Sequence, residues 1–545
     1  MEFNLADLFE AVVGTVPDAE ALVCGSSDAP TIRRTYAELD DRADRVSRVL
    51  AARGVGPGDR VGLHLFNGPE FIEAMLASYK LRAIPVNVNY RYVAEELRYL
   101  IEDSAMAAIV TEPDLLAVVR EAVGATSTST SALVSTLAEP IVRGDRYEEE
   151  LEAHPGGRLD IGPRSADDHY ILYTGGTTGR PKGVVWRHED IYFASLGGRG
   201  TPSKGVPMLT APEQIVDRVR RGDPIMRRLP LCPLIHGGAM WVALQSLLVG
   251  GALVLDADRH FDPVTALRLL AGERVELTMV IGDATARPLA DALGRLRADD
   301  PAACDLSSLQ VIASGGAVLS ASVKAELRAL LPGTAVVDTF GASETGGQGR
   351  LTRAADGALR LVTDEQTAVL DDHLRPVAPG RTGRLARSGF IPIGYHGDPV
   401  RSAATFPVID GVRWSVPGDL ARLEPDGTII LLGRGSTSIN TGGEKVFPEE
   451  VENVVKGHPA VYDAMVVGVP DERFGERVVA VVAGRPGAPV PSDDELAAAA
   501  RIHLAGYKVP RAWVWVDHCQ RLPTGKPDYG WARQVAIDRG VASPP

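Results

Sequence analysis

Residues 173–183 read Tyr-Thr-Gly-Gly-Thr-Thr-Gly-Arg-Pro-Lys-Gly, and this stretch indicates the fold and the chemistry more strongly than any other. Its four glycines free the backbone for tight turns and for close approach to a ligand. Three threonine hydroxyls and the ammonium group of Lys182 surround that backbone with donors and positive charge. Donors packed around bare backbone form a good site for an anion. The stretch therefore predicts a phosphate-binding loop.

An ordinary glycine-rich surface turn is the alternative interpretation of this stretch. Such turns rarely combine three threonines and a lysine with four glycines, so we favour the phosphate loop. It is not a Walker A motif, because Lys182 is followed by Gly183 where Ser or Thr is required. The residues expected to contact phosphate are Thr174, Gly175, Gly176, Thr177, Thr178, Gly179 and Lys182.

The length and charge of the chain limit the protein classes to consider. A chain of 545 residues is too long for one hydrophobic core and indicates two or three domains. Its hydrophobic fraction of 45% is that of an ordinary globular protein. The net charge is −14 and no long basic run occurs, so nucleic acid is not an expected partner. The oligomeric state is not fixed by these features.

Cysteine usage and the chain start bear on location. The four cysteines are isolated and fit neither a disulfide framework nor a zinc site, which favours a reducing cytoplasm. The first residues lack the charged start and apolar core of a signal peptide. No apolar run reaches the roughly 18 residues of a membrane span, so no integral membrane segment is expected.

Strand-like and helical segments alternate in the first third of the chain. Apolar residues recur at helical spacing over 35–53, a strand pattern covers 60–66, a helix pattern covers 69–80, and an apolar strand covers 83–88. This alternation is typical of α/β proteins. Acidic residues, Gly and Pro fill residues 144–164, which we interpret as a connector that leads to the phosphate loop.

Three later segments each combine a short apolar strand with a turn of small residues that carries polar groups. They are residues 277–283, 309–317 and 335–344. In open α/β sheets, ligands bind at the carboxyl ends of the strands. We therefore expect these three turns to converge on one site.

Two composition changes suggest boundaries. Residues 197–228 hold Gly, Pro and Ser followed by a basic helix-like piece, and we interpret them as an insertion or lid. Near residue 434 the composition shifts again, which predicts an N-terminal domain over 1–433 and a C-terminal domain over 434–545.

The C-terminal part has the pattern of a small α+β domain. We expect a helix over 448–457, strands over 462–469 and 477–484, and a further helix that starts at a capping box. Ser492 and Glu495 form that box and the helix should end near Gly506.

Residues 340–345 read Phe-Gly-Ala-Ser-Glu-Thr and give the second strong signal. Gly341 lets the chain turn after the strand, and Phe340 can lie flat against a base. Glu344 offers a hard oxygen ligand suited to Mg²⁺ chelated by a triphosphate. A strand end with an exposed glutamate is the alternative.

With these motifs the chain resembles the adenylate-forming superfamily, which includes acyl-CoA synthetases, adenylation domains of peptide synthetases and luciferases. The resemblance runs from about residue 5 to about residue 535 and departs at Gly175, where the family commonly has Ser. It implies a large N-terminal domain of stacked α/β sheets with a β-barrel-like subdomain, and a small mobile α+β C-terminal domain. The phrases 79–92 and 439–448 are closest to actinobacterial fatty-acyl-CoA synthetases.

The resemblance assigns nucleotide roles residue by residue. It implies that Phe340 contacts adenine, Glu344 holds Mg²⁺ and Thr345 touches the α-phosphate. Asp419 and Arg434 would bind the ribose hydroxyls, although an Asp after Gly is usually a solvated turn residue. The other expected ATP contacts are Gly315, Gly316, Ala317, Asp338, Gly341 and Ser343.

The same resemblance reverses the ordinary interpretation of Lys526, which would be a surface lysine. It implies that this lysine enters the active site for adenylation, where the α-phosphate gathers negative charge that an ammonium can neutralise. Ser436 stands at the family's hinge, where Asp or Lys is usual. Gly442 and Gly443 match the glycine turn that lines the thiol tunnel after domain rotation.

His236 matches the residue that gates the acyl pocket, although a lone His near an apolar stretch is most often a packed core residue. Gly237 follows it where peptide-synthetase adenylation domains have an Asp, which disfavours an α-amino acid substrate. The expected pocket lining is rich in small residues and suggests a bulky apolar acid. It comprises His236, Gly238, Trp241, Leu244, Asp283 and Gly315.

Three functions remain open at this point. The first is an ATP-dependent acid–thiol ligase that makes an acyl-CoA through acyl-AMP, with Mg²⁺ as cofactor and a carboxylic acid, ATP and CoA as partners. The second is a natural-product diazotase that uses ATP and nitrite to convert an arylamine to a diazo group. The third is a nucleotide-binding protein without catalysis, which would need neither Glu344 nor Lys526.

Overall fold

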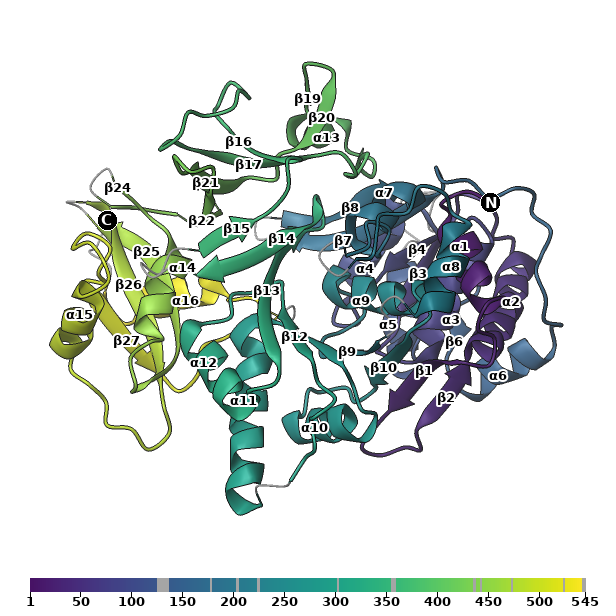
Figure 1. Cartoon of the computed structure of the whole chain (residues 1–545), viewed down its shortest axis with the longest axis horizontal. Coiled ribbons are helices and arrows are strands. Elements are labelled where there is room, and N and C mark those ends of the chain that lie inside the picture. The colour runs from purple at the N-terminus through teal and green to yellow at the C-terminus, as the bar shows by residue number, and fades with distance from the viewer. Residues whose placement is uncertain are drawn as a thin grey trace.

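The computed structural model describes residues 1–124, 137–176, 179–201, 205–222, 226–300, 303–353, 359–434, 438–441, 444–471, 474–522 and 525–541. Figure 1 shows a large N-terminal part and a small C-terminal part, the latter in yellow-green and yellow at the left of the view. Both parts mix helices with strands, as the sequence predicts. Within the described residues no helix is long and apolar enough to cross a membrane.

A 15-stranded sheet runs through the large part. Five parallel pairings join β1, β10, β9, β11, β12 and β13 in this order, and every pairing beyond β13 is antiparallel. Along the sheet the strands are β19 (Val408–Ile409), β20 (Val412–Ser415), β17 (Thr382–Ser388), β21 (Asp419–Leu423), β22 (Ile429–Arg434), β15 (Leu359–Val362), β14 (Gly346–Arg353), β13 (Ala335–Ala342), β12 (Val311–Ser314), β11 (Leu277–Val280), β9 (Arg227–Pro230), β10 (Ala252–Asp256), β1 (Glu20–Gly25) and β2 (Ile32–Thr35), with β16 (Thr367–Leu370) paired to β17. The antiparallel strands form the expected barrel-like part, but no pairing among the described strands closes it.

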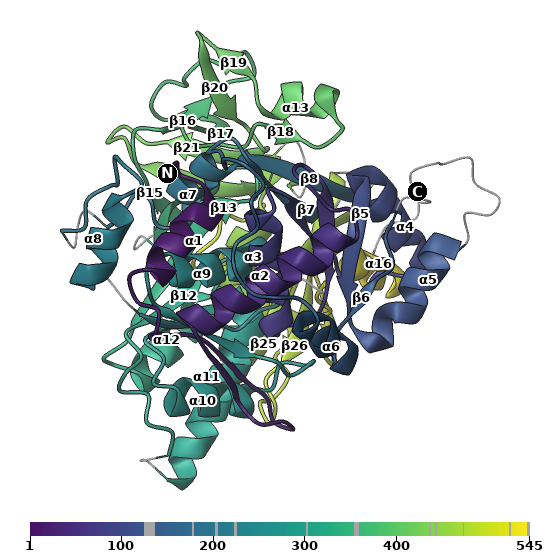
Figure 2. The same cartoon turned by 90° about the vertical axis from the view of Figure 1, so that its right-hand side faces the viewer.

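Two smaller sheets complete the large part. One is parallel and four-stranded, with the order β4 (Ile84–Asn87), β3 (Arg60–His64), β5 (Met106–Thr111) and β6 (Ile141–Val142). The other is antiparallel, with the order β18 (Gly394–Tyr395), β8 (Gly179–Arg187) and β7 (His169–Gly176). Apolar side chains of β7 and β8 share a buried cluster with β4 and β5, so the phosphate-loop hairpin lies against the four-stranded sheet (Figure 2).

Helices cover these sheets. They are α1 (Leu5–Val13), α2 (Tyr36–Ala52), α3 (Pro69–Lys80), α4 (Ala94–Ser104), a 3₁₀ turn at Pro113–Leu115, α5 (Leu116–Gly124), α6 (Asp145–Glu152), α7 (His188–Ser195), α8 (Gln214–Arg221), α9 (Gly237–Leu248), α10 (Pro263–Gly272), α11 (Gly282–Asp299), α12 (Ala321–Leu330) and α13 (Pro399–Thr405). The predicted helix over 69–80 is confirmed at both ends, with Pro69 in its first turn. The basic piece in 197–228 is confirmed as α8, but the side chain of Arg218 turns inward and donates to the carbonyls of Gly197 and Pro207.

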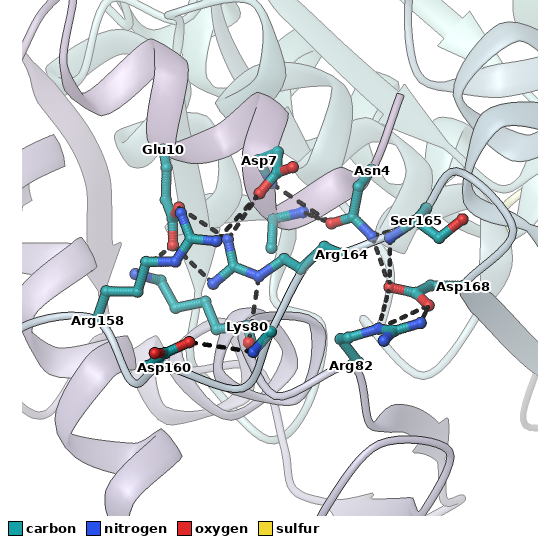
Figure 3. A network of polar contacts seen from close by, with 12 residues as sticks. Asn4, Asp7, Glu10, Lys80, Arg82, Arg158, Asp160, Arg164, Ser165 and Asp168 are labelled. Atoms are coloured by element: carbon teal, nitrogen blue, oxygen red, sulfur yellow. Dashed lines mark hydrogen bonds and ion pairs between the residues drawn. The ribbon is translucent and has the colours of Figure 1, made fainter. Parts of the chain in front are cut away.

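The connector before the phosphate loop is more ordered than the sequence indicates. Residues 144–164 contain α6, whose Tyr147 and Leu151 lie four residues apart and are buried. Beyond it, Arg164 is buried and its Nη1 donates to Asp7 Oδ1 at 2.9 Å and to Glu10 Oε2 at 2.8 Å (Figure 3).

This network continues into the body of the protein. Lys80 Nζ lies 3.3 Å from Glu10 Oε1. Arg82 Nη2 donates to Oδ1 of Asp168 at 2.8 Å, and Asp168 is the residue directly before β7 (Figure 3). Burial raises the pKa of Glu10, but Arg164 and Lys80 outweigh it and hold that pKa below its usual value. The ion pairs therefore fix the point at which the chain enters the phosphate-loop hairpin.

The C-terminal part is built on a five-stranded sheet with the order β24 (Glu444–Val446), β23 (Ile439–Thr441), β26 (Gly475–Gly484) and β25 (Val461–Asp471), and with β27 (Ala512–Val516) paired to β26. Alternate residues of β25 and β26 enter two separate cores. One core is covered by α14 (Pro448–Val455) and α15 (Asp493–Arg501), and the other by α16 (Tyr529–Asp538). The predicted strands and the capping box of Ser492 with Glu495 are confirmed, whereas α15 ends at Arg501 and not near Gly506.

Candidate active site

The three predicted turns meet at the carboxyl ends of β11, β12 and β13, which are neighbouring parallel strands. Thr339 Oγ1 on β13 donates to the carbonyl of Ser314 at the end of β12, at 2.8 Å. A methyl group at Gly315 would lie 2.9 Å from the same hydroxyl, so only glycine leaves the turn this close to β13. Gly316 has φ +77°, and Ala317 ends the turn. This backbone has the tight turn that the sequence predicts, and its contact with adenine stays a prediction.

Two buried polar atoms lie beside that turn. Asp338 Oδ2 accepts from Lys324 Nζ at 2.8 Å, while Asp338 Oδ1 and Ser314 Oγ are buried without a hydrogen bond to any described residue. Buried polar atoms normally find a partner. An acceptor and a hydroxyl in this position fit the polar edge of a nucleotide base.

The turn between β13 and β14 is held from three sides. Trp186 Nε1 donates to the Ser343 carbonyl at 3.1 Å, and Ser415 Oγ donates to the Glu344 carbonyl at 2.6 Å. Thr345 is buried, and its hydroxyl accepts from the Ala342 amide at 3.0 Å. The Thr345 side chain thus closes the turn. Its hydroxyl donates to the Gly346 carbonyl at 3.1 Å, so its predicted contact with the α-phosphate would need that bond to rearrange.

A close backbone approach shapes the same turn. A methyl group at Gly341 would lie 2.4 Å from the Gly346 carbonyl oxygen. The turn therefore requires glycine at 341, and the preceding residue, Phe340, packs against a small buried cluster.

Tyr395 joins the Glu344 turn to the phosphate loop. Its hydroxyl donates to Glu344 Oε1 at 2.9 Å, and its ring centre lies 5.2 Å from Lys182 Nζ. Burial and the Glu344 carboxylate raise the pKa of the Tyr395 phenol, so the phenol stays protonated as a donor. Lys182 itself lies on β8 opposite Thr174 of β7. Lys182 and Glu344, which the sequence places 162 positions apart, therefore share one neighbour.

A metal ion at this site would rely on few protein ligands. No cluster of three or more His, Cys, Asp or Glu side chains able to hold a metal occurs among the described residues. One carboxylate suits a Mg²⁺ that takes its remaining ligands from water and from a triphosphate. Tyr395 occupies only Oε1 of Glu344, so this site fits such an ion.

The two residues predicted to bind ribose are brought together. Asp419 opens β21, Arg434 ends β22, and the two are directly paired across these antiparallel strands. They are 15 positions apart in the chain, and the hairpin makes them neighbours.

The predicted acid pocket lies at α9 and β11. His236 is the residue before α9, and Trp241 Nε1 donates to the Tyr170 hydroxyl at 3.1 Å. Methyl groups at Gly238 and Gly315 would lie 2.5 and 3.1 Å from Met279 Cε. Met279 therefore fills the space that these two glycines leave open, a neighbour that the sequence motifs do not reveal.

Asp283, also predicted to line the pocket, bonds to residues outside that lining. Its Oδ1 accepts from the Ser320 amide at 2.8 Å, and its Oδ2 lies 3.5 Å from Lys456 Nζ of the C-terminal part. The predicted contact of Asp283 with the acid stays a prediction.

The loop that carries Lys526 reaches this site from the C-terminal part. Leu522 pairs with Lys526 through a backbone bond of 2.8 Å, and Arg521 forms a β-bridge with Pro527. Gly525 has φ +76°, and a methyl group there would lie 3.0 Å from Ile281, directly after β11. The loop therefore lies against the carboxyl end of β11 and presents an exposed Lys526.

Family models match this chain over most of its length. The model for "AMP-binding enzyme" matches residues 9–391, and the model for "AMP-binding enzyme C-terminal domain" matches residues 450–526. The chain belongs to the AMP-binding enzyme family. This assignment agrees with the resemblance to the adenylate-forming superfamily.

Relatives of this AMP-binding enzyme span nearly its full length. A 3-oxocholest-4-en-26-oate–CoA ligase of Rhodococcus rhodochrous is 44% identical over 548 residues, which cover 98% of this chain and 96% of the relative. A medium/long-chain-fatty-acid–CoA/3-oxocholest-4-en-26-oate–CoA ligase of Mycobacterium tuberculosis is 44% identical over 540 residues, covering 97% and 96%.

Solved structures share the fold of this AMP-binding enzyme. The ATP-bound MatB of Rhodopseudomonas palustris aligns with a TM-score of 0.79 and 26% identity, covering 99% of this chain and all of the other. The anthranilate CoA ligase AuaEII in complex with anthranoyl-AMP aligns with a TM-score of 0.81 and 22% identity, covering 98% of each chain.

Five predicted site residues of this AMP-binding enzyme lie outside the described residues: Thr177, Thr178, Ser436, Gly442 and Gly443. Their neighbours are described. Gly176 pairs with Gly179 across the phosphate-loop hairpin, and Thr441 pairs with Glu444 across the hairpin of β23 and β24. The roles of the five residues stay predictions.

Proposed function

We propose that this enzyme is an ATP-dependent acid–thiol ligase that converts a bulky apolar carboxylic acid to its acyl-CoA through acyl-AMP. The observation that carries the proposal is that the Lys526 loop packs on Ile281 directly after β11, while the neighbouring parallel strands β12 and β13 lead into the Gly315 turn and the Glu344 turn. A protein that only bound a nucleotide would need neither Glu344 nor Lys526. Relatives of 44% identity are named CoA ligases, which supports a thioester product and gives no support to the nitrite-dependent alternative.

The first step joins the acid to AMP. A carboxylate oxygen attacks the α-phosphorus of ATP, and the bond to the β-phosphate oxygen breaks to release pyrophosphate. Thr174, the glycines of the loop and Lys182 hold the phosphates, and the ammonium of Lys526 offsets the charge that gathers on the α-phosphate. Mg²⁺ held by Glu344 would neutralise phosphate charge.

The second step transfers the acyl group to the thiol. The sulfur of CoA attacks the acyl carbon, AMP leaves with the electron pair of the broken carbon–oxygen bond, and the thiol proton passes to solvent. We place this step after rotation of residues 434–545 about Ser436, with residues 1–433 as the fixed domain. Gly442 and Gly443 would then line the path of the thiol, and residues 197–228 would cover the acid.

The acid class follows from the pocket and from the relatives. Gly238 and Gly315 face a flexible Met279, and methionine adapts its shape to irregular apolar ligands. The names of the relatives include 3-oxocholest-4-en-26-oate and, for one of them, medium/long-chain fatty acids as the acids that are joined to CoA. We propose fatty or sterol side-chain acids as the substrates.

A pyrophosphate-release screen tests the function. Fatty, sterol-type and aromatic acids are compared with and without CoA, and acyl-CoA is quantified by mass spectrometry. We expect release with an apolar acid and an acyl-CoA when CoA is added. ATP consumption that requires nitrite and an arylamine, with no thioester from any acid, would replace the proposal by the diazotase.

Replacing Glu344 with Gln tests the metal role. The amide keeps the shape of the side chain but removes the charge that favours a hard cation. We expect at least about tenfold more Mg²⁺ for the half-maximal rate of pyrophosphate release, the effect that even outer contacts of metal ligands commonly have. Mg²⁺ titration of both enzymes gives this number.

Tyr395→Phe is the comparison variant for Glu344→Gln. It removes the hydrogen bond to Glu344 and keeps the carboxylate, so we expect a smaller rise in the Mg²⁺ requirement. An unchanged requirement in Glu344→Gln would assign Glu344 a structural role.

A further inference from the structure

One face of α11 contacts the C-terminal part through three charged residues spaced four apart, which places them on the same side of the helix. Asp283 Oδ2 lies 3.5 Å from Lys456 Nζ. The guanidinium carbon of Arg287 lies 4.9 Å from the ring centre of Tyr462. The Tyr462 hydroxyl donates to Asp291 at 3.1 Å. Of these three residues, only Asp283 is predicted from the sequence to have a function, and that function is a contact with the acid.

Lys456 is the buried centre of this contact. It follows the last residue of α14, is 4% exposed, and lies 3.2 Å from Asp463 Oδ1 as well as 3.5 Å from Asp283. Burial lowers the pKa of the Lys456 ammonium, but Asp463, Asp283 and Glu452 outweigh it and raise that pKa above its usual value. Lys456 is therefore charged, and it holds one carboxylate from each part of the chain.

A series of contacts leads from Lys456 to the Lys526 loop. Asp463 Oδ2 accepts from Arg521 Nη2 at 2.6 Å, and Arg521 Nη1 donates to the Gly525 carbonyl at 3.3 Å. Gly525 precedes Lys526 and packs on Ile281, two residues before Asp283. The contacts from Lys456 through Asp463 and Arg521 to Gly525 are thus fixed to the N-terminal part at both ends, by the ion pair at Asp283 and by the packing at Ile281.

We propose that Lys456 is a positioning residue for acyl-AMP formation. Its pair with Asp283 anchors the C-terminal part on α11, and through Asp463 and Arg521 it sets the Lys526 loop against the end of β11. The contact can also be released, because Lys456 keeps Asp463 as its partner when Asp283 moves away. This role rests on the proposed two-step function, in which only the first step uses this arrangement.

A double-mutant cycle tests this role. Lys456→Met, Asp283→Asn and the double variant are compared in pyrophosphate release with an apolar acid and in thiol transfer from preformed acyl-AMP. Each single change should slow pyrophosphate release by about five- to tenfold, the lower range of coupling between distant sites, and leave thiol transfer unchanged. The double variant should be no slower than the slower single variant, because both changes remove the same pair.

Two variants control for loss of folding and for the general effect of removing a lysine. Asp283→Asn keeps an oxygen for the Ser320 amide, so it disturbs folding least if Lys456→Met is unstable. Lys508→Met is the matched control, because Lys508 pairs with Glu450 of α14 at 2.7 Å within the C-terminal part. It should release pyrophosphate at the wild-type rate.

The outcomes separate the anchoring role from the function. Equal losses in both half-reactions, or additive losses in the double variant, would overturn the anchoring role, and additivity would return Asp283 to the acid pocket. Full rates in both single variants would overturn it as well. Failure of the wild-type enzyme to release pyrophosphate with any acid would instead overturn the proposed function.

Discussion

Lys526→Ala should lower the rate of acyl-AMP formation by at least about a hundredfold, the loss that follows removal of one group stabilising transition-state charge. Thiol transfer from preformed acyl-AMP should keep its wild-type rate, because the proposed rotation removes this loop before the second step. The loop itself should survive the change, since Leu522 and Lys526 pair through their backbones. Rapid-quench measurement of each half-reaction gives both rates.

The control for Lys526→Ala is Lys508→Ala, which removes a lysine of the same part of the chain that lies outside the loop. It should leave both half-reactions unchanged. Equal losses in the two half-reactions of Lys526→Ala would contradict the assignment of the two steps to two domain arrangements.

Gly443→Trp should have the opposite signature. We expect acyl-CoA formation to fall by at least about a hundredfold, because displacing a reacting atom by about 1 Å can already cost this much. Pyrophosphate release driven by the acid should continue, because the residue lies beside the proposed hinge and not among the ATP contacts. Both products are measured on the same variant.

Gly443→Ala separates size from backbone freedom in that test. A methyl group should leave most thioester formation, whereas the indole should block it. Normal acyl-CoA production by Gly443→Trp would show that the thiol path lies elsewhere.

Local sequence signals predict a helix or strand best where the sequence itself marks the residues at which that element begins and ends. The helix over 69–80 begins at a proline and has a continuous apolar pattern, and the structure confirms both ends. The helix α6 escapes prediction because only Tyr147 and Leu151 among its eight residues are buried, and the remainder are mostly acidic. The end of α15 is missed because the apolar pattern continues beyond Arg501.

In the predicted site, too, residues within short motifs are found from the sequence, whereas contacts between distant segments are not. Asp419 and Arg434 stand in short motifs, so the resemblance finds them, and the strand pairing brings them together. Tyr395 meets Glu344 across 51 positions and Met279 meets Gly238 across two elements. No local pattern encodes these contacts, because they arise only when separate strands are placed side by side.

The 15-stranded sheet also affects how the protein unfolds. Its backbone hydrogen bonds run without interruption from β2 through β12 to β20, so the strands that carry the nucleotide contacts should open together and protect their amides from exchange to a similar degree. The five-stranded sheet of the C-terminal part forms no strand pairing with it among the described residues and has cores of its own. Heating should therefore melt the protein in two separable transitions, with ATP raising the one that belongs to the larger sheet.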